Sequence, residues 1–194
     1  MGTTVAHLPR RAMVRHGGTG HFAAIINGMG KKHAAASAGT PATVALSAAG
    51  VSFTPHAYAH DPAAASFGME AAQVLGVAPE RVFKTLMADV DGTLTVAVVP
   101  VNGSLNLKAL AHACGHKRAA MADPAVAQRR TGYVLGGISP LGQRQHSPTV
   151  VDESALLFET VYVSGGRRGF DVELAPTDLL RLTNAITAPI SHAG

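Results

Sequence analysis

The sequence has no tryptophan, a single cysteine and few charged residues, and each shortage excludes a class of protein. With Cys114 as the only cysteine among 194 residues, neither an internal disulfide framework nor a cysteine-rich zinc site can form. Aromatic residues make up only 5% of the chain, so alanine, valine and leucine must fill the core. Hydrophobic residues make up 47% and charged residues 14%, which excludes a chain that is disordered throughout.

Long apolar runs are also missing. No uninterrupted run approaches the ~20 residues that span a bilayer. The basic residues near the N-terminus are not followed by the apolar stretch of a secretory signal. We therefore expect no membrane partner and a location in the cytoplasm.

Ten histidines raise the question of a metal site. His56 and His60 lie four residues apart, but on a segment with the character of a strand and a loop rather than a helix. His112 and His116 have the same spacing, and Gly115 interrupts the helix between them. Because no carboxylate completes either pair, we expect neither a metal ion nor another cofactor.

The net charge of +4 is unevenly distributed. Residues 1–38 carry five basic residues and no acid, whereas residues 39–194 carry eleven basic and twelve acidic residues, a net charge of −1. Since the first segment also lacks a sustained apolar period, we predict a disordered basic extension over residues 1–38 and one folded domain over residues 39–194. A basic arm that touches RNA, an organellar presequence and an upstream start codon are alternative explanations of this segment.

Cap and turn signals divide the folded region into helices and strands. Thr40-Pro41 begins a helix that Gly50 ends, and Asp91-Gly92 is typical of the turn of a β-hairpin. Direct strand-to-strand links favour a mixed sheet in an α+β fold. The predicted helices cover residues 41–49, 67–75, 107–114, 124–130 and 179–186, and the predicted strands cover residues 51–58, 82–90, 93–101, 149–151, 155–163 and 170–174.

Three features are candidates for chemistry. Lys84 lies inside the apolar run Val82–Leu86, where it either alternates outward to solvent or projects into a cleft, to hold a phosphate or polarise a carbonyl. The run Gly136–Pro140 is either a simple turn or a backbone that approaches a ligand closely and offers its N–H groups. A second glycine-rich turn, Ser164–Gly169, contains two arginines, which form either a solvated hairpin tip or a contact to a phosphate backbone.

No arrangement typical of a side-chain nucleophile is present in the sequence. The Gly-x-Ser-x-Gly elbow of Ser-His-Asp hydrolases is missing. Cys114 follows an alanine- and leucine-rich helix and is interpreted as a small core residue rather than an activated thiol. The sequence therefore offers little support for a Ser-His-Asp hydrolase or for a cysteine nucleophile.

Six segments between about residues 40 and 190 share their order and spacing with a known family. They are Phe53–Gly68 with its His60-Asp61-Pro62, Val82–Leu86, Ala120–Pro124, Thr131–Tyr133, Gly136–Pro140 and Tyr162–Gly169. Together they resemble the YbaK/EbsC family of Cys-tRNA(Pro) deacylases. The resemblance does not extend to residues 1–38.

This resemblance implies a fold, a reaction and partners. The implied fold is that of the prolyl-tRNA synthetase editing domain, a mixed and partly barrelled β-sheet flanked by helices. The implied reaction is trans-editing of tRNA(Pro) mischarged with cysteine, which is close to proline in size, because a pocket separates such near-isosteres by only ~1–3 kcal/mol. The implied partners are the acceptor end of aminoacyl-tRNA and, as a candidate, prolyl-tRNA synthetase; no DNA partner is expected.

The resemblance also assigns roles to residues of this sequence. Lys84 matches the key polar residue of the family, and Gly137 belongs to the turn whose backbone N–H groups would stabilise a developing oxyanion, so both are predicted to be catalytic. The predicted substrate-binding residues are Tyr58, Phe67, Thr85, Ile138, Ser139, Ser164 and Asp171.

The absence of a nucleophile motif fits a reaction in which the substrate supplies its own. The thiol of the bound cysteine would attack its ester carbonyl and expel the ribose hydroxyl. One alternative is a deacylase for another small amino acid, such as Ala-tRNA(Pro), which would need an activated water. Another is a non-catalytic module of the same fold that binds tRNA or a synthetase; the intact Lys84 and Gly136–Pro140 favour an active enzyme.

Overall fold

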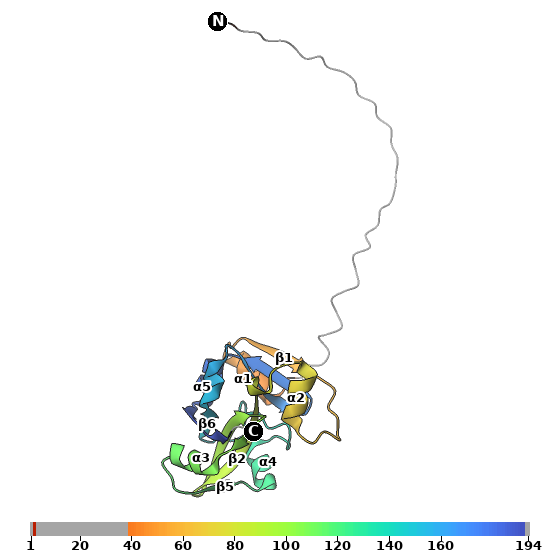
Figure 1. Ribbon diagram of the computed structural model, residues 1–194. Coiled ribbons are helices and arrows are strands. Elements are labelled where there is room, and N and C mark those ends of the chain that lie inside the picture. Colours follow the sequence, from red (N-terminus) through yellow and green to blue (C-terminus); the bar gives the residue numbers. More distant parts are fainter. Residues whose placement is uncertain (1, 3–38, 193–194) are drawn as a thin grey trace. The chain divides into compact units, whose positions relative to one another are not determined.

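A computed structural model describes residue 2 and residues 39–192; the basic extension predicted for residues 1–38 thus lies outside the described residues, apart from Gly2. Residues 39–192 form a mixed eight-stranded sheet with helices on both faces (Figure 1). The helices are α1 (Pro41–Ala48), α2 (Phe67–Leu75), α3 (Leu107–Ala113), α4 (Pro124–Thr131) and α5 (Pro176–Thr183), with short 3-10 helices at Pro79–Arg81 and Glu153–Leu157. The strands are β1 (Phe53–Ala57), β2 (Val82–Val90), β3 (Thr93–Pro100), β4 (Ser104–Leu105), β5 (Ala119–Met121), β6 (Thr149–Asp152), β7 (Val161–Arg167), β8 (Phe170–Leu174), β9 (Ile186–Ala188) and β10 (Ser191–His192).

The order of strands in the sheet confirms the predicted mixed topology. It runs β1-β8-β7-β2-β3-β6-β9, with β5 paired to β2, while β4 and β10 form a separate two-stranded sheet. The β2–β7, β3–β6 and β6–β9 pairs are parallel and the others are antiparallel. Asp91 and Gly92 join β2 to β3 with φ angles of 46° and 90°, the positive values that a tight hairpin turn requires. Among the described residues, no helix has both the length and the apolar character needed to cross a membrane.

Alternating side chains of the central strand β2 contribute to cores on the two faces of the sheet. Phe83 and Met87 pack into a cluster that includes buried residues of α1, α4 and α5. Ala88 and Val90 pack on the opposite face, against buried residues of α3. Near the start of the strand, on that same face, Val82 packs with residues of α2. The sheet is therefore the middle of three layers.

One side of β2 has an opening. Its first two residues pair with β7, through Val82 opposite Tyr162 and Phe83 opposite Val163. Its last three residues pair with β5. Between these two ladders, residues 84–87 have no strand neighbour on this side among the described residues. The sheet thus separates beside the middle of its central strand.

Among the predicted elements, the structure differs most from the sequence-based prediction at two places. The strand predicted over residues 155–163 is confirmed for residues 161–163 and wrong for residues 155–160: the Asp152 carboxylate accepts the Ser154 N–H at 3.1 Å and starts the 3-10 helix Glu153–Leu157, and β7 begins only at Val161. The helix predicted over residues 179–186 instead begins at Pro176 and ends where Asn184 takes a left-handed φ of 49°. The short strands β4, β5, β9 and β10 were not predicted.

Candidate functional site

A cavity of about 340 Å³ lies at the opening beside β2. Its wall includes residues 82–87 of β2, the start of α2, the segment Met121–Ala122 and the turn around Gly136. Seven of the nine predicted site residues line it: Tyr58, Phe67, Lys84, Thr85, Ile138, Ser164 and Asp171. The fold therefore brings these seven residues, which lie between positions 58 and 171 of the sequence, together in one cavity.

Lys84 projects into this cavity from the middle of β2. Its ammonium group donates to the carbonyl oxygen of Gly103 at 2.6 Å and, more weakly, to that of Val101 at 3.4 Å. Burial lowers the pKa of Lys84 from its ordinary value. An ammonium group has three donors, so these two contacts leave one N–H for a ligand. Of the two interpretations of Lys84, the structure supports the cleft rather than the solvent-facing one.

Asp171 supplies a buried carboxyl group to the same cavity. Only 7% of the residue is exposed, and burial raises its pKa to about 6, with a smaller opposing effect from His56. It lies in β8 directly opposite Ser164 of β7 and His56 of β1. Opposite residues of antiparallel strands point to the same face, with Cβ atoms about 4.5–5.5 Å apart. The three side chains therefore form a polar row across one face of the sheet.

Tyr58 follows β1 and lies beside this row. Its backbone N–H donates to the carbonyl oxygen of Gly169 at 2.9 Å, which places the residue against the turn between β7 and β8. Burial, followed by the negative charges of Asp171 and Glu70, raises the pKa of Tyr58 well above its ordinary value. The phenol therefore stays protonated and offers an O–H donor inside the cavity.

Thr85 is the residue of β2 whose polar groups face the opening. The Val82 carbonyl accepts from Val101 on the β3 side, and the Met87 carbonyl accepts from Ala122 on the β5 side. Because backbone groups alternate along a strand, the N–H and C=O of Thr85 point toward the opening. Its buried hydroxyl oxygen has no hydrogen-bond partner within the described part of the chain. An unpartnered buried polar atom costs ~1–3 kcal/mol, so the Thr85 hydroxyl is a candidate for a hydrogen bond to a ligand.

Gly137 and Ser139 are not among the residues that line the cavity. The Gly137 N–H donates to the Val134 carbonyl at 3.0 Å, and the buried Ser139 hydroxyl accepts the Leu141 N–H at 3.2 Å. Both residues shape the turn behind the wall, whereas Gly136 reaches the cavity itself. Gly136 has a φ of 79°, and a Cβ atom there would lie 2.7 Å from the Phe67 ring, so any other residue would strain the backbone and displace the ring.

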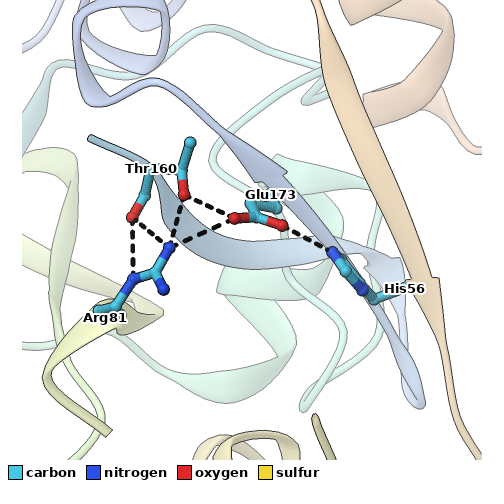
Figure 2. A network of polar contacts seen from close by, with 4 residues as sticks. All are labelled: His56, Arg81, Thr160 and Glu173. Atoms are coloured by element: carbon cyan, nitrogen blue, oxygen red, sulfur yellow. Dashed lines mark hydrogen bonds and ion pairs between the residues drawn. The ribbon is translucent and has the colours of Figure 1, made fainter. Parts of the chain in front are cut away.

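A polar network beside Asp171 was missed from the sequence. Figure 2 shows Glu173 between His56, whose Nε2 lies 3.0 Å from one carboxylate oxygen, and Arg81, whose guanidinium lies 3.3 Å from the other. The Thr160 hydroxyl donates to Glu173 at 2.6 Å and accepts from Arg81 at 2.6 Å. Burial would raise the pKa of Glu173, but its hydrogen bonds from Thr160 and His56 outweigh burial and hold the pKa below its ordinary value. The network fixes His56 next to Asp171.

Cys114 lies away from this cavity, at the C-terminal end of α3. The residue is half-buried, and burial raises the pKa of its thiol. A raised pKa reduces the thiolate fraction and hence the reactivity of the sulfur. Its position and chemistry suit the interpretation as a small packing residue.

Known proteins resemble this chain in sequence and in structure. The aminoacyl-tRNA editing domain family matches residues 61–182. A candidate Cys-tRNA(Pro)/Cys-tRNA(Cys) deacylase of Enterococcus faecalis, EbsC, is 41% identical over 121 residues, which are 62% of this chain and 74% of EbsC.

Two crystal structures share the fold. The hypothetical protein APE2540 superimposes with a TM-score of 0.71 at 27% identity, over 79% of this chain and 100% of APE2540. A candidate trans-editing enzyme for prolyl-tRNA synthetase superimposes with a TM-score of 0.68 at 24% identity, over 78% of this chain and 95% of that one. These matches confirm the predicted fold, a mixed and partly barrelled sheet flanked by helices.

Proposed function

The chain belongs to the aminoacyl-tRNA editing domain family and is an aminoacyl-tRNA deacylase, and we propose that it cleaves the ester that joins cysteine to tRNA(Pro). The 41% identity to EbsC supports cysteine as the amino acid. Prolyl-tRNA synthetase is the proposed source of the mischarged substrate and a proposed partner. The cavity at the opening beside β2 is the proposed active site.

The proposed mechanism is based on the types of residue that line the cavity. None of the residues that line the cavity is a histidine or a cysteine, so the wall holds no Ser–His or Cys–His pair. In the proposed mechanism, the thiol of the substrate cysteine is the nucleophile. Its sulfur forms a bond to the ester carbonyl carbon, the bond from that carbon to the ribose oxygen breaks, and the thiol proton ends on the ribose oxygen. The product is a cyclic thioester that water hydrolyses, and the tRNA leaves uncharged.

The polar groups of the cavity have complementary roles in this reaction. The Asp171 carboxylate binds the α-ammonium group of the amino acid, since the two opposite charges meet where water is scarce. The Thr85 N–H, which points into the opening, donates to the carbonyl oxygen as negative charge develops there. Lys84 contributes its remaining N–H to the same charge or to the terminal phosphate.

Deacylation of tRNA(Pro) charged with cysteine, serine or alanine tests this proposal. Serine replaces the thiol with a hydroxyl, which ionises far less readily, so we expect the serine ester to react at least ~10-fold more slowly than the cysteine ester. Alanine offers no nucleophile and should react more slowly still. Equal single-turnover rates on the cysteine and serine esters would contradict the thiol mechanism but not the deacylase assignment.

The raised pKa of Asp171 favours a second candidate function. A carboxylate with a pKa of about 6 is a stronger base than an ordinary aspartate and can activate water near neutral pH. An enzyme that uses it in this way would deacylate Ala-tRNA(Pro) as well as the cysteine ester. In the same assay, a rate on the alanine ester that equals the rate on the cysteine ester would select this candidate.

Binding should depend on pH through Asp171. The raised pKa means that the carboxylate is lost as pH falls through about 6, so affinity for the substrate ammonium should fall there. Because His56 lowers the pKa of Asp171, His56→Gln should move this loss to higher pH. The measurement is the dissociation constant, from pH 5 to 8, of a tRNA whose cysteine is joined by an uncleavable amide. The exposed His112 provides a control: His112→Gln should leave the profile unchanged.

We also propose that residues 39–194 carry the activity alone. The family match lies wholly within this range, as do the cavity and its supporting network. A chain that starts at Gly39 should deacylate Cys-tRNA(Pro) at a rate within about twofold of the full chain and melt within a few degrees of it. A large loss of rate would show instead that residues 1–38 contribute to substrate binding or to the reaction.

A further inference from the structure

Three distant segments meet at the mouth of the cavity. Phe67 starts α2, Leu135 belongs to the turn after α4, and Arg168 lies in the turn between β7 and β8. The Arg168 guanidinium carbon lies 5.1 Å from the centroid of the Phe67 ring, and its Nε donates to the Leu135 carbonyl at 2.9 Å. The arginine is thus held in place by an aromatic face and a carbonyl group.

The Phe67 ring is fixed from other directions as well. His60 packs against it with ring centroids 5.2 Å apart and is itself bound to Glu70 at 2.8 Å. The backbone of Gly136 approaches the ring so closely that a Cβ atom would clash with it. Even so, 39% of Phe67 remains exposed. A flat side chain that is packed on several sides and still partly exposed is suited to stacking, because little conformational entropy is lost on binding.

Exposed apolar side chains continue around this mouth. Met121 and Leu135, which line the same cavity, are 51% and 38% exposed. Arg168 adds a positive charge that no carboxylate pairs with among residues 39–192. A ligand for this mouth, defined here by Phe67, Met121, Leu135 and Arg168, therefore has flat apolar faces and negative charge. Single-stranded nucleic acid has both.

The proposed function places the same ligand here. With the aminoacyl group in the cavity, the terminal ribose and its base must lie at the opening, followed by the preceding unpaired nucleotides. We propose that the mouth formed by Phe67, Met121, Leu135 and Arg168 binds the single-stranded 3′ end of tRNA. Arg168 stacks on a nucleobase with its exposed outer face or contacts the adjoining phosphate, and Phe67 supports it from below. This inference rests on the proposed function.

Fluorescence anisotropy with two RNA hairpins tests the inference without any catalysis. One hairpin ends in an unpaired CCA sequence and the other is blunt. We expect the wild-type protein to bind the first about 10-fold more tightly, since stacking of a base contributes ~1–3 kcal/mol. Arg168→Ala and Phe67→Leu should each remove most of this difference. Arg118→Ala, which changes another surface arginine with a 90% exposed side chain, should not.

Deacylation kinetics separate this inference from the proposed function. In Arg168→Ala, whose side chain is not among those that line the cavity, KM for Cys-tRNA(Pro) should rise about 10-fold while kcat and the melting temperature stay near wild-type values. If the wild-type protein deacylates its substrate but Arg168→Ala keeps KM unchanged and both variants keep the hairpin preference, the inference is wrong and the proposed function stands. A fall in kcat at unchanged KM would also overturn it. If the wild-type protein cleaves no aminoacyl-tRNA, the proposed function fails, and the hairpin preference alone decides the inference.

Discussion

Lys84→Ala is expected to reduce single-turnover deacylation of Cys-tRNA(Pro) by ~100-fold, a barrier increase of ~2.7 kcal/mol. Lys84 lines the cavity. In the proposed mechanism it places a cation where the polyanionic substrate and its developing oxyanion bind. A charge contact is stronger there than in water because the surrounding protein has a lower dielectric constant. The carbonyls of Gly103 and Val101 hold the ammonium group in position, so little reorganisation is needed during the reaction.

Two further variants distinguish the charge of Lys84 from its packing. Lys84→Met keeps an unbranched side chain of similar length but removes the charge, and should lose as much activity as the alanine variant. Lys84→Arg keeps the charge but introduces a planar group that cannot reproduce both carbonyl contacts, so it should lose activity in part. Lys108→Met, at an exposed position of α3, is the matched control. Full activity in Lys84→Met, with the melting temperature unchanged, would refute a role for the charge.

Local signals in the sequence were sufficient for elements that carry their own start and stop residues. Helix α2 was predicted with its correct bounds because Gly76, with a φ of 65°, ends it. The hairpin of β2 and β3 was predicted because Asp91-Gly92 adopts the positive φ angles that it favours. In contrast, β5 and β9 have only three residues each, and they exist because β2 and β6 offer them free edges. No periodic pattern of their own could have identified them.

The candidate site was predictable to the extent that the family resemblance supplied its residues. The apolar pattern alone could not predict the environment of the Lys84 side chain, because alternation along a strand does not reveal whether its polar side faces solvent or a cavity. The opening beside β2 depends on where β7 ends and β5 begins, which is a property of the whole sheet. The network of His56, Arg81 and Glu173 joins residues up to 117 positions apart. One signal was available: Asp171 and Glu173 are two apart in a strand, so both point to the face of His56.

Asp171→Asn should make the protein more stable at neutral pH and less active. A pKa of about 6 in the folded protein, against an ordinary value of 3.8, means that the fold favours the protonated carboxyl. Between these two values the folded state binds more protons than the unfolded state, so the free energy of unfolding decreases as pH rises. Above pH 6 the destabilisation by the buried carboxylate reaches roughly 3 kcal/mol. Asparagine has a similar shape and no charge, and it removes this destabilisation.

The pH dependence of the stability gain identifies its origin. Urea unfolding of the two proteins should give nearly equal free energies at pH 4, and the Asp171→Asn variant should become the more stable one as pH rises to 7. Glu159→Gln, a change at an exposed carboxylate, should show no such trend. The Asp171→Asn variant also loses the charge that we propose binds the α-ammonium group, and a hydrogen bond between charged partners contributes ~1.5–3 kcal/mol, so KM for Cys-tRNA(Pro) should rise about 10- to 150-fold. An unchanged KM in Asp171→Asn would show that the Asp171 carboxylate does not bind the substrate. The absence of a stability gain at pH 7 would show that its buried charge does not destabilise the fold.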